Sequence, residues 1–446
     1  MNFRLALFFG AALRLAALPL PGTHDTAVWK IWSYGAATQG VGRAYGVGGN
    51  PPERGVFSLH GAEATVDYPP LAVAELAVVG HVFRAINHGT YPDDRRLIVA
   101  VKIPALTADA GLLALIYFAV RRFKGEAAAR TAAVMYWLNP AVVLAGAALG
   151  YLDTLFVLPA LGAIVAAYTG MPIIAGASAA AALLTKPQAV VLLPAMAWAM
   201  WRAESRDGRQ TRRLLVAGTT AVITTVVIVA PVLAAGALPN LLNAMSRLGA
   251  HDMLSANGCN VWWIVGYLLR VRHSFADMGL WTAVTAPARI LAISRVMDLG
   301  YPNPRTIGTL MVLSVAIWAI WTARVRRDLW IASALAALLA HDYATLSAQV
   351  HENHLFAAVP LLVVAAAGRP GFRPVLFAVS AIFALNLNLF YGISEDVGYA
   401  IPRSLTIIDM TIWLAAVNCA ALVWHARAFH RECSTASVSR PAPAPA

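Results

Sequence analysis

Long apolar runs recur along nearly the whole chain, and they constrain its fold more than any other feature. The 446 residues are 59% hydrophobic and only 13% charged, with a mean hydropathy of +0.65. Soluble domains are less apolar than this. Because a transmembrane helix needs about 20 mostly apolar residues, the length leaves room for about ten to fourteen crossings. We expect an all-α, polytopic integral membrane protein with about 12 to 14 transmembrane helices.

Basic residues form short clusters between the apolar runs. The chain carries a net charge of +12, but it lacks the basic stripe with interleaved aromatic residues that is typical of nucleic-acid binding. In membrane proteins, arginine and lysine gather on the cytoplasmic side. We therefore assign that side to the clusters at 121–130, 202–213, 324–327, 369–373 and 427–431.

Threading the apolar runs between these clusters brings a set of polar segments to the opposite, external face. The first run, 3–20, lacks a cleavage site of the A-x-A kind and is followed by further spans, so we expect it to remain as a helix with its N-terminus inside. The segments predicted to share the external face are those around Asp25, Asp153, Asn260, Asp298, 351–354 and 395–396.

Two stretches do not thread as simple crossings. The runs 70–87 and 97–120 would make two crossings, although the basic cluster at 121 requires an odd number after Asp25. One run is therefore re-entrant or broken, or the 121 loop violates the charge rule. The run 173–201 is interrupted at 185–188, where a proline removes a backbone donor. We expect two short helices there that meet at a polar tip, with both outer ends cytoplasmic.

The longest polar stretch, 21–69, is predicted to be an external first loop. Trp29, Trp32 and Tyr34 lie beside Lys30 with the spacing of an amphipathic helix. Such a helix lies in the membrane interface with its rings at headgroup depth.

The domain organisation is expected to be simple. Residues 1–426 form a single transmembrane domain, and the Pro-rich end, 427–446, forms a disordered cytoplasmic tail. The three cysteines have neither disulfide nor metal-ligand spacing, so we expect them to be unpaired.

Three aspartates at the external face are candidates for chemistry, because an ionisable group at the membrane edge is costly unless it is paired or solvated. Asp25 can act as a general base toward a hydroxyl nucleophile, or it is simply a solvated loop residue. Asp67 opens the sequence Asp-Tyr-Pro-Pro and is expected to cap the helix that follows. Asp153 ends the sequence Gly-Tyr-Leu-Asp and is a second carboxylate aimed at the same cavity.

Two lysines lie in apolar surroundings. Lys186 needs an anionic partner, which is either a protein carboxylate or a phosphate. Lys102 and Asp109 lie two helical turns apart on one face and are expected to be structural.

The sequence His-Glu-Asn-His at 351–354 opens an apolar helix from the external side. Polar groups at a helix N-terminus favour an anion. The spacing differs from His-Glu-x-x-His and supplies too few ligands, so we expect no metal. Asn257 and Asn260 precede Trp262 and Trp263, which are expected to be interface anchors.

This order of features resembles the GT-C glycosyltransferases, polytopic membrane enzymes that use a polyprenyl-phosphate sugar as donor. The likeness is greatest to the glucosyltransferases of the N-glycan precursor pathway and to bacterial relatives of the GPI-anchor mannosyltransferases. At Asn353 those glucosyltransferases have a lysine, and Gly-Tyr-Leu-Asp replaces their His-x-Gln-Tyr-Asn type of sequence. The resemblance is carried by Asp25 with Trp32, 67–70, 102–109, 139–140, 150–153, 186–188, 260–262 and 351–352.

The resemblance implies an inverting, metal-independent and cofactor-free transfer of mannose or glucose to a hydroxyl of a lipid-linked or cell-envelope glycan. Asp25 would be the catalytic base. Contacts to the donor phosphate and substrate would come from Tyr151, Asp153, Lys186, Asn260, His351 and Glu352, and the acceptor side from Trp32, Asp67 and Tyr68. The expected partners are the donor, the acceptor and membrane lipids. The expected location is a bacterial inner membrane, with the active site on the external or periplasmic face.

Two other classes of membrane protein share some of these features. Transporters and lipid flippases also contain broken helices and polar groups in the membrane, but they lack the concentration of polar residues at one face that we find here. A protein glycosyltransferase would use the same scaffold with a peptide acceptor.

Overall fold

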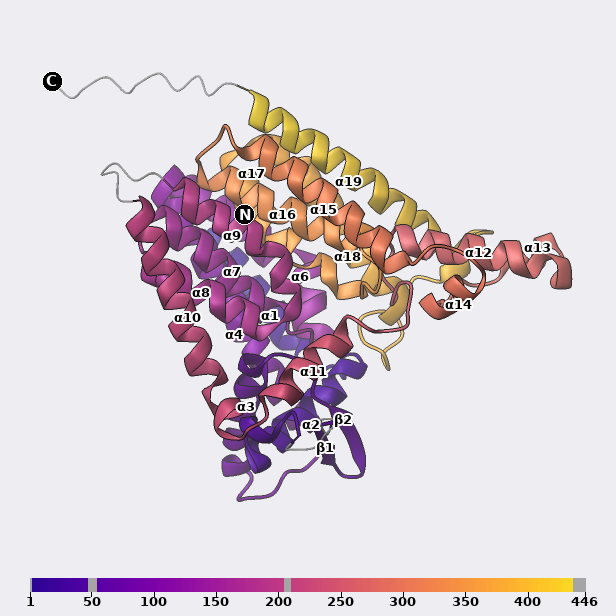
Figure 1. The fold of residues 1–446 in the computed structure, drawn as a ribbon, viewed down its shortest axis with the longest axis horizontal. Coiled ribbons are helices and arrows are strands. Elements are labelled where there is room, and N and C mark those ends of the chain that lie inside the picture. Colours follow the sequence, from indigo (N-terminus) through magenta and orange to yellow (C-terminus); the bar gives the residue numbers. More distant parts are fainter. Residues whose placement is uncertain (1, 47–53, 204–209, 436–446) are drawn as a thin grey trace.

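The computed structural model describes residues 2–46, 54–203 and 210–435. Within these ranges the chain is almost entirely helical (Figure 1). Its one sheet is an antiparallel hairpin of β1 (Val56–Leu59) and β2 (Ala62–Thr65). The expected all-α class is therefore confirmed.

Six helices in the described part of the chain are long and apolar enough to cross a membrane by themselves. They are α4 (Arg95–Lys124), α10 (Gln210–Ala234), α15 (Pro304–Ala323), α16 (Leu329–Leu346), α18 (Arg373–Tyr391) and α19 (Met410–Ser434). A seventh span results if α5 (Glu126–Trp137), α6 (Pro140–Val143) and the π-helical turn Leu144–Ala148 are counted together across a bend of 49°. The chain is an integral membrane protein.

Short apolar helices complete the bundle. They are α7 (Asp153–Tyr168), α8 (Pro172–Thr185) and α17 (Ala358–Gly368). The predicted number of 12 to 14 crossings depends on such short and bent helices, and it stays a prediction.

The centre of the bundle is formed by α16 and α17. In α16, 83% of the 18 residues are buried inside the protein. Helix α17 is buried along most of its length between α4, α5, α16 and α18. Both helices are rich in alanine. Small side chains let the backbones of neighbouring helices approach closely, and this packing stabilises a membrane bundle, in which no hydrophobic effect drives the helices together.

The predicted basic clusters lie together at one end of the bundle. The Arg202 side chain donates to the carbonyl oxygen of Arg324. Lys124 Nζ donates to the carbonyl oxygen of Gly368 over 2.8 Å, and Arg326 Nε donates to that of Cys433 over 2.9 Å. These contacts involve residues in or next to all five clusters, which the charge rule predicts for a cytoplasmic face.

The first loop forms a compact unit at the other end. It contains α2 (His24–Gln39), the hairpin and α3 (Pro70–Ile86), and it follows α1 (Phe3–Ala17). Helix α3 packs along α2, and beyond it the Tyr91 hydroxyl lies 2.6 Å from Ser33 Oγ of α2. Helix α3 is not among the candidate spans of the described residues, whereas α4 is, which favours a single crossing between Asp25 and the cluster at 121.

The prediction that the aromatic residues of α2 lie at headgroup depth is wrong. Trp29 and Trp32 are 3% and 1% exposed. Their ring centroids lie 5.0 Å apart, and both rings contact Tyr68. The loop folds back over α2, so these rings form its core instead of a membrane anchor. The Gly-rich run at 40–49 lies partly outside the described residues.

The broken helix of 173–201 is confirmed. Helix α8 ends at Thr185, a 3-10 turn covers Pro187–Leu192, and α9 follows at Leu193–Arg202. Lys186 lies between them in an extended conformation with φ of −147°. The proline ends the first helix, so a lysine is placed at a helix break inside the protein.

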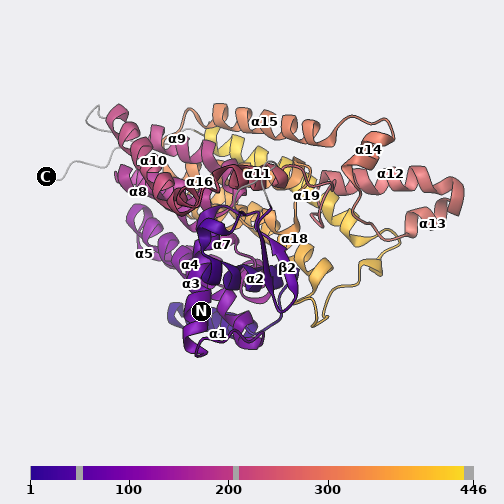
Figure 2. The same ribbon diagram turned by 60° about the horizontal axis from the view of Figure 1, so that its bottom comes forward.

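Four helices lie between α10 and α15 in the chain. Helix α11 (Leu238–Leu248) packs on the first-loop unit through Leu241 and Ala244. An arm is formed by α12 (Val261–Met278), α13 (Leu280–Thr285) and α14 (Ile293–Asp298). Figure 2 shows α12 and α13 reaching beyond the other helices. The expected anchoring role of Trp262 and Trp263 is wrong, because both are buried and donate to Leu346 O and Thr411 Oγ1.

The C-terminal tail begins later than predicted. Helix α19 continues through Arg427 and Arg431 to Ser434, so residues 427–434 are helical. The remainder of the predicted tail, from 436, lies outside the described residues. Cys259, Cys419 and Cys433 are all unpaired, as expected.

Asn260 has a structural role that can be measured. Its Oδ1 accepts from the backbone N–H of Trp263 at 3.0 Å and caps α12. We expect Asn260→Ala to lower the free energy of unfolding by about 1 kcal/mol, as loss of an N-cap does. Asn303→Ala, which removes the cap of α15, is the matched control for loss of a second asparagine cap. No measurable change for Asn260→Ala would contradict this role.

Candidate active site

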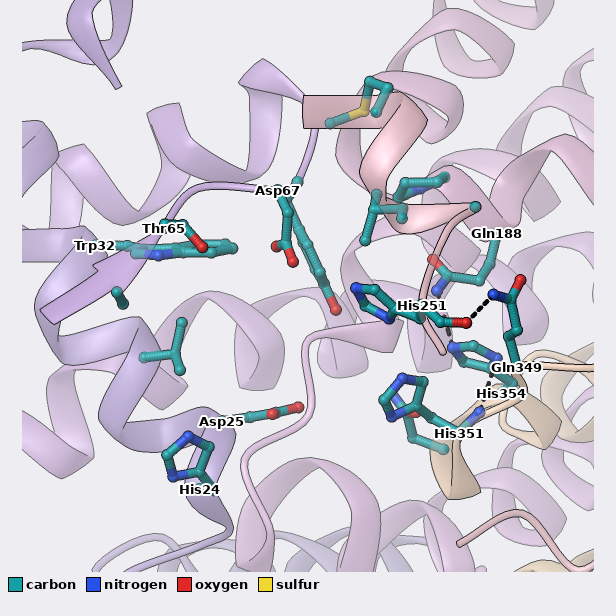
Figure 3. A pocket seen from close by; sticks show the side chains of 18 of the residues that line it. His24, Asp25, Trp32, Thr65, Asp67, Gln188, His251, Gln349, His351 and His354 are labelled. Carbon is teal, nitrogen blue, oxygen red and sulfur yellow. Dashed lines mark hydrogen bonds between the residues drawn. The ribbon is translucent and has the colours of Figure 1, made fainter. Parts of the chain in front are cut away.

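A cavity of about 850 Å³ opens at the end of the bundle that lies opposite the basic clusters. Its walls come from α2, the hairpin, the end of α11, the 3-10 turn after Lys186 and residues 343–354. Figure 3 shows Asp25 and His24 on one side, Asp67 above them, and His251, His351 and His354 across the same space. Segments that are more than 300 residues apart in sequence therefore meet here, as the topology predicted for the external face.

The start of α2 holds Asp25 in the cavity wall. The backbone N–H of Thr23 donates to Leu149 O at 3.1 Å, and that of Gly22 donates to Ser394 Oγ at 2.9 Å. One turn after Asp25, Trp29 Nε1 donates to Gly150 O at 3.1 Å. The carboxylate is thus carried on backbone that is fixed on both sides.

Lys102 stabilises the backbone on either side of this contact between residues 22–23 and 149. Its ammonium donates to three carbonyl oxygens, Leu20 O at 2.7 Å, Ala148 O at 2.7 Å and Ala147 O at 3.2 Å. These carbonyls belong to the end of the first helical segment and to the π-helical turn. Lys102 does not pair with Asp109, which instead accepts from Arg14 Nε at 2.5 Å and from Tyr136. Both residues are structural, as expected, but in two separate networks.

Burial sets the protonation of Asp25. It raises the pKa of the carboxyl to about 6, and the nearby Glu352 adds to the rise, while Lys186 and His351 oppose it. A carboxyl with this pKa is mostly ionised at pH 7 and is a stronger base than a solvated aspartate.

The segment 351–354 faces Asp25 from the opposite wall. His351 pairs with Ala256 and Asn257 as a short β-bridge, which ties the segment to the loop before α12. Burial lowers the pKa of His351 to about 4, and Asp25 opposes this. The imidazole is therefore neutral at pH 7, and each ring nitrogen either donates or accepts a hydrogen bond.

Four predicted site residues lie behind the cavity wall instead of in it. Lys186 Nζ donates to Asp153 Oδ1 at 2.7 Å, and the two side chains are 1% and 3% exposed. Asp153 also accepts from Asn353 at 2.8 Å, and Tyr151 donates to Glu352 at 2.5 Å. In this structure the anionic partner of Lys186 is therefore a protein carboxylate, that of Asp153. The pair and the Tyr151 bond hold the segment 351–354 against α7.

The prediction that Asp67 caps a helix is wrong. Helix α3 has Pro69 at its N-cap and no side-chain cap, whereas Asp67 lines the cavity with Tyr68 and Trp32. Burial raises the pKa of Asp67, and the neighbouring His251 and Arg247 oppose this. Asn260, by contrast, is not among the lining residues, because its side chain caps α12.

Several lining residues were not predicted from the sequence. They are His24, Arg54, Glu63, His251 and Gln349. Gln188 and His354 also line the cavity, and they belong to the segments 186–188 and 351–354 that the sequence singled out. Gln188 follows the helix break, and its Nε2 lies 2.8 Å from His354 Nε2. His251 is an isolated histidine in a loop, which gives no pattern to read. In the described part of the chain, no group of three or more His, Cys, Asp or Glu side chains has the arrangement of a metal site.

Comparisons with known proteins place the architecture. No family model and no curated protein matches the sequence. Among solved structures, the chain is similar to ArnT from Cupriavidus metallidurans, solved with undecaprenyl phosphate, with a TM-score of 0.50 and 13% sequence identity, covering 96% of this chain and 77% of that one. ArnT is a GT-C glycosyltransferase. The chain has the GT-C fold.

An oligosaccharyltransferase from Archaeoglobus fulgidus, tethered to an acceptor peptide, is a more distant match. Its TM-score is 0.43 and its identity 13%, covering 97% of this chain and 55% of that one. Thus the chain spans about half of that protein.

The cavity surrounds Asp25 with carboxylates, cations and rings. The first-loop side contributes Asp67, Glu63, Arg54 and His24 with the ring of Trp32, and the opposite side contributes the imidazoles of His251 and His351. A buried carboxylate in such surroundings can accept a proton from a hydroxyl group.

Proposed function

We propose that the protein is a glycosyltransferase that transfers a monosaccharide from a polyprenyl-phosphate sugar to a hydroxyl of a lipid-linked or cell-envelope glycan. The observation that carries the proposal is Asp25, a carboxylate with a raised pKa in an external cavity of a GT-C fold. ArnT, the neighbour with a TM-score of 0.50, was solved with undecaprenyl phosphate, which is a lipid carrier of the proposed kind.

In the proposed reaction the acceptor hydroxyl attacks the anomeric carbon of the donor. The new C–O bond forms as the bond from that carbon to the phosphate oxygen breaks, and the proton of the hydroxyl passes to Asp25. Polyprenyl phosphate leaves with the electron pair. Direct displacement with a single base predicts inversion at the anomeric carbon, and mannose or glucose is the proposed sugar. The protein supplies alignment, a base and neutralisation of charge, so no metal or cofactor is required.

The donor phosphate is proposed to lie against His351. The imidazole lines the cavity, and its pKa rises when an anion is bound nearby, so phosphate binding and protonation support each other. Lys186, Asp153, Tyr151 and Glu352 are proposed to act through their bonds to the segment 351–354, as positioning residues. In this proposal these four residues do not contact the donor phosphate directly.

The acceptor is proposed to enter from the first loop. Asp67 accepts hydrogen bonds from hydroxyl groups, and Trp32 and Tyr68 provide ring faces beside it. We propose that this side faces the periplasm of a bacterial inner membrane, because the basic clusters lie at the opposite end of the bundle.

The pH dependence of transfer tests the role of Asp25. The pKa of about 6 means that the base is ionised above this pH and protonated below it. We expect kcat/KM for the donor to be constant from pH 7 to 8 and to fall about tenfold for each pH unit below 6, as for one essential base. The measurement is kcat/KM between pH 5 and 8, with unfolding followed in parallel as a control. A flat profile with intact protein would contradict the assignment.

A further inference from the structure

A groove runs between α18 and α19 on the outer surface of the bundle. It has a volume of about 490 Å³, and every lining side chain is apolar. Alanines at 378, 381, 420 and 421 lie along it, and the indoles of Trp413 and Trp424, which are 53% and 43% exposed, project at its edge. Two helices with small facing residues would normally close against each other, so an open groove here is unusual.

The groove continues into a second cavity of about 700 Å³ at the external end. Leu389 lines both. The second cavity lies between α13 and residues 400–409, and its lining includes Trp281 together with Arg403, Ser404 and Thr406. The path therefore changes from apolar to polar along its length, which is the chemistry of an amphiphile.

The groove starts at the end of the bundle that lies opposite the basic clusters. Helix α18 begins next to the cluster at 369–373 and ends at Tyr391, and α19 begins at Met410. Ala378 and Leu389 are eleven residues apart, which is about 16 Å of helix, and Met410 and Trp424 are about 21 Å apart. Both lengths exceed the roughly 15 Å of half a hydrocarbon core. The groove is therefore long enough for one acyl chain of a lipid whose headgroup lies at that end.

Arg403 lies at the polar end of the groove, where hydrogen bonds fix its side chain. Its Nε and Nη2 donate to Asp409, and Nη2 also donates to Ala288 O at 2.6 Å. The Asp409 carboxylate is 3% exposed and also accepts from Thr411. Within the described residues, no protein atom accepts from Arg403 Nη1 or from the Ser404 hydroxyl. A fixed guanidinium with a free edge beside a hydroxyl suits a phosphate.

We propose that this groove binds a glycerophospholipid of the outer leaflet, with one acyl chain between α18 and α19 and its phosphate at Arg403 and Ser404. The site is separate from the cavity that contains Asp25, because the opposite side of α18 faces that part of the protein through Asn386, which bonds Cys259 and Asn257. The proposal stands whether or not the protein transfers sugar. A polyprenyl chain is much longer than the groove and is not its occupant.

Photolabelling tests the site. The probe is phosphatidylglycerol with a diazirine in the middle of one acyl chain, added to the purified protein in detergent and mapped by peptide mass spectrometry. We expect most of the label within 378–389 and 410–424. In Ala381→Leu/Ala420→Leu, which adds bulk at two exposed positions of the groove, we expect at least a tenfold loss. Ala230→Leu, at an exposed position of α10, is the matched control and should keep the label within twofold.

Two further probes test whether the phosphate is needed and whether the bound chain is an acyl chain or a polyprenyl chain. A diacylglycerol with the same diazirine chain lacks the phosphate, so we expect at least fivefold less label in the groove. A polyprenyl-phosphate probe should label the groove less than phosphatidylglycerol does. Even labelling over α10, α15, α18 and α19, labelling unchanged in the double variant, or a preference for either of these two probes would overturn the proposal. Thermal unfolding in lipid-free detergent should be the same for the double variant and the control, which excludes misfolding as the cause of lost label.

Discussion

Replacing Asp25 by asparagine is expected to lower kcat for sugar transfer by about 10²- to 10⁴-fold, the range that general-base catalysis contributes. The amide has nearly the same shape as the carboxylate but does not take a proton at neutral pH. The surrounding contacts of α2 come from the backbone of Thr23 and Gly22 and from Trp29, and none involves the Asp25 carboxylate. The fold should therefore be retained and the loss should appear in kcat.

The experiment compares Asp25→Asn with wild type in kcat, in KM for the donor and in thermal unfolding. Asp277→Asn, at an exposed position of α12, is the matched control and should have wild-type activity. The proposed pH profile makes a second comparison, because the fall below pH 6 should vanish in any residual activity of Asp25→Asn. Near-wild-type turnover by this variant would show that another group is the base.

Replacing Lys186 by methionine is expected to lower the free energy of unfolding by about 3 to 5 kcal/mol, as when one partner of a buried ion pair is removed. The reason is the Asp153 carboxylate, which is 3% exposed and would lose its ammonium partner at 2.7 Å. Its remaining side-chain partner is Asn353 at 2.8 Å. The measurement is unfolding in a detergent titration at fixed protein concentration.

The double variant Lys186→Met/Asp153→Asn tests whether the lost stability comes from the unpaired charge of Asp153. It removes both charges, so most of the lost stability should return. Arg96→Met, which breaks an exposed ion pair with Asp94, is the control for a surface pair and should change stability by less than about 1 kcal/mol. If Lys186→Met were as stable as wild type and only the donor KM rose, Lys186 would be a phosphate ligand and the structural role would be wrong.

The membrane architecture could be predicted because two signals in the sequence are physical constraints on every membrane protein. Apolar runs have to be long enough to cross, and basic residues stay on the cytoplasmic side. The second signal predicts that the clusters share one end of the bundle, and the contacts of Lys124 and Arg326 agree with it. The break at Lys186 could also be predicted, because Pro187 lies in a polar interruption of the apolar run. A proline by itself is not sufficient, since α4, α7 and α10 each contain one.

Other features depend on tertiary packing, which no local pattern encodes. Trp29 and Trp32 have interfacial spacing, but the first loop covers them with Tyr68. The run 70–87 is apolar, and one face of α3 packs on α2 while Val78, Val82 and Ile86 stay exposed. Composition alone does not show which apolar surface is covered by protein.

The candidate site was predictable in its parts and not in its arrangement. Asp25, Asp67 and His351 do line one cavity. The sequence left a protein carboxylate and a phosphate open as the partner of Lys186, and only the structure gives it Asp153. His251 comes from a loop more than 200 residues away from Asp25, and a single histidine has no sequence context that marks it as part of a site.

The most direct test of the proposed function is transfer of labelled mannose or glucose by the purified protein. The donors are synthetic polyprenyl-phosphate mannose and polyprenyl-phosphate glucose, the acceptor is a membrane lipid extract, and a parallel reaction contains EDTA. We predict transfer that persists in EDTA and is lost in Asp25→Asn. If no donor is used, and reconstituted protein instead moves labelled lipid across a bilayer, the cavity is a translocation path and the proposed function is wrong.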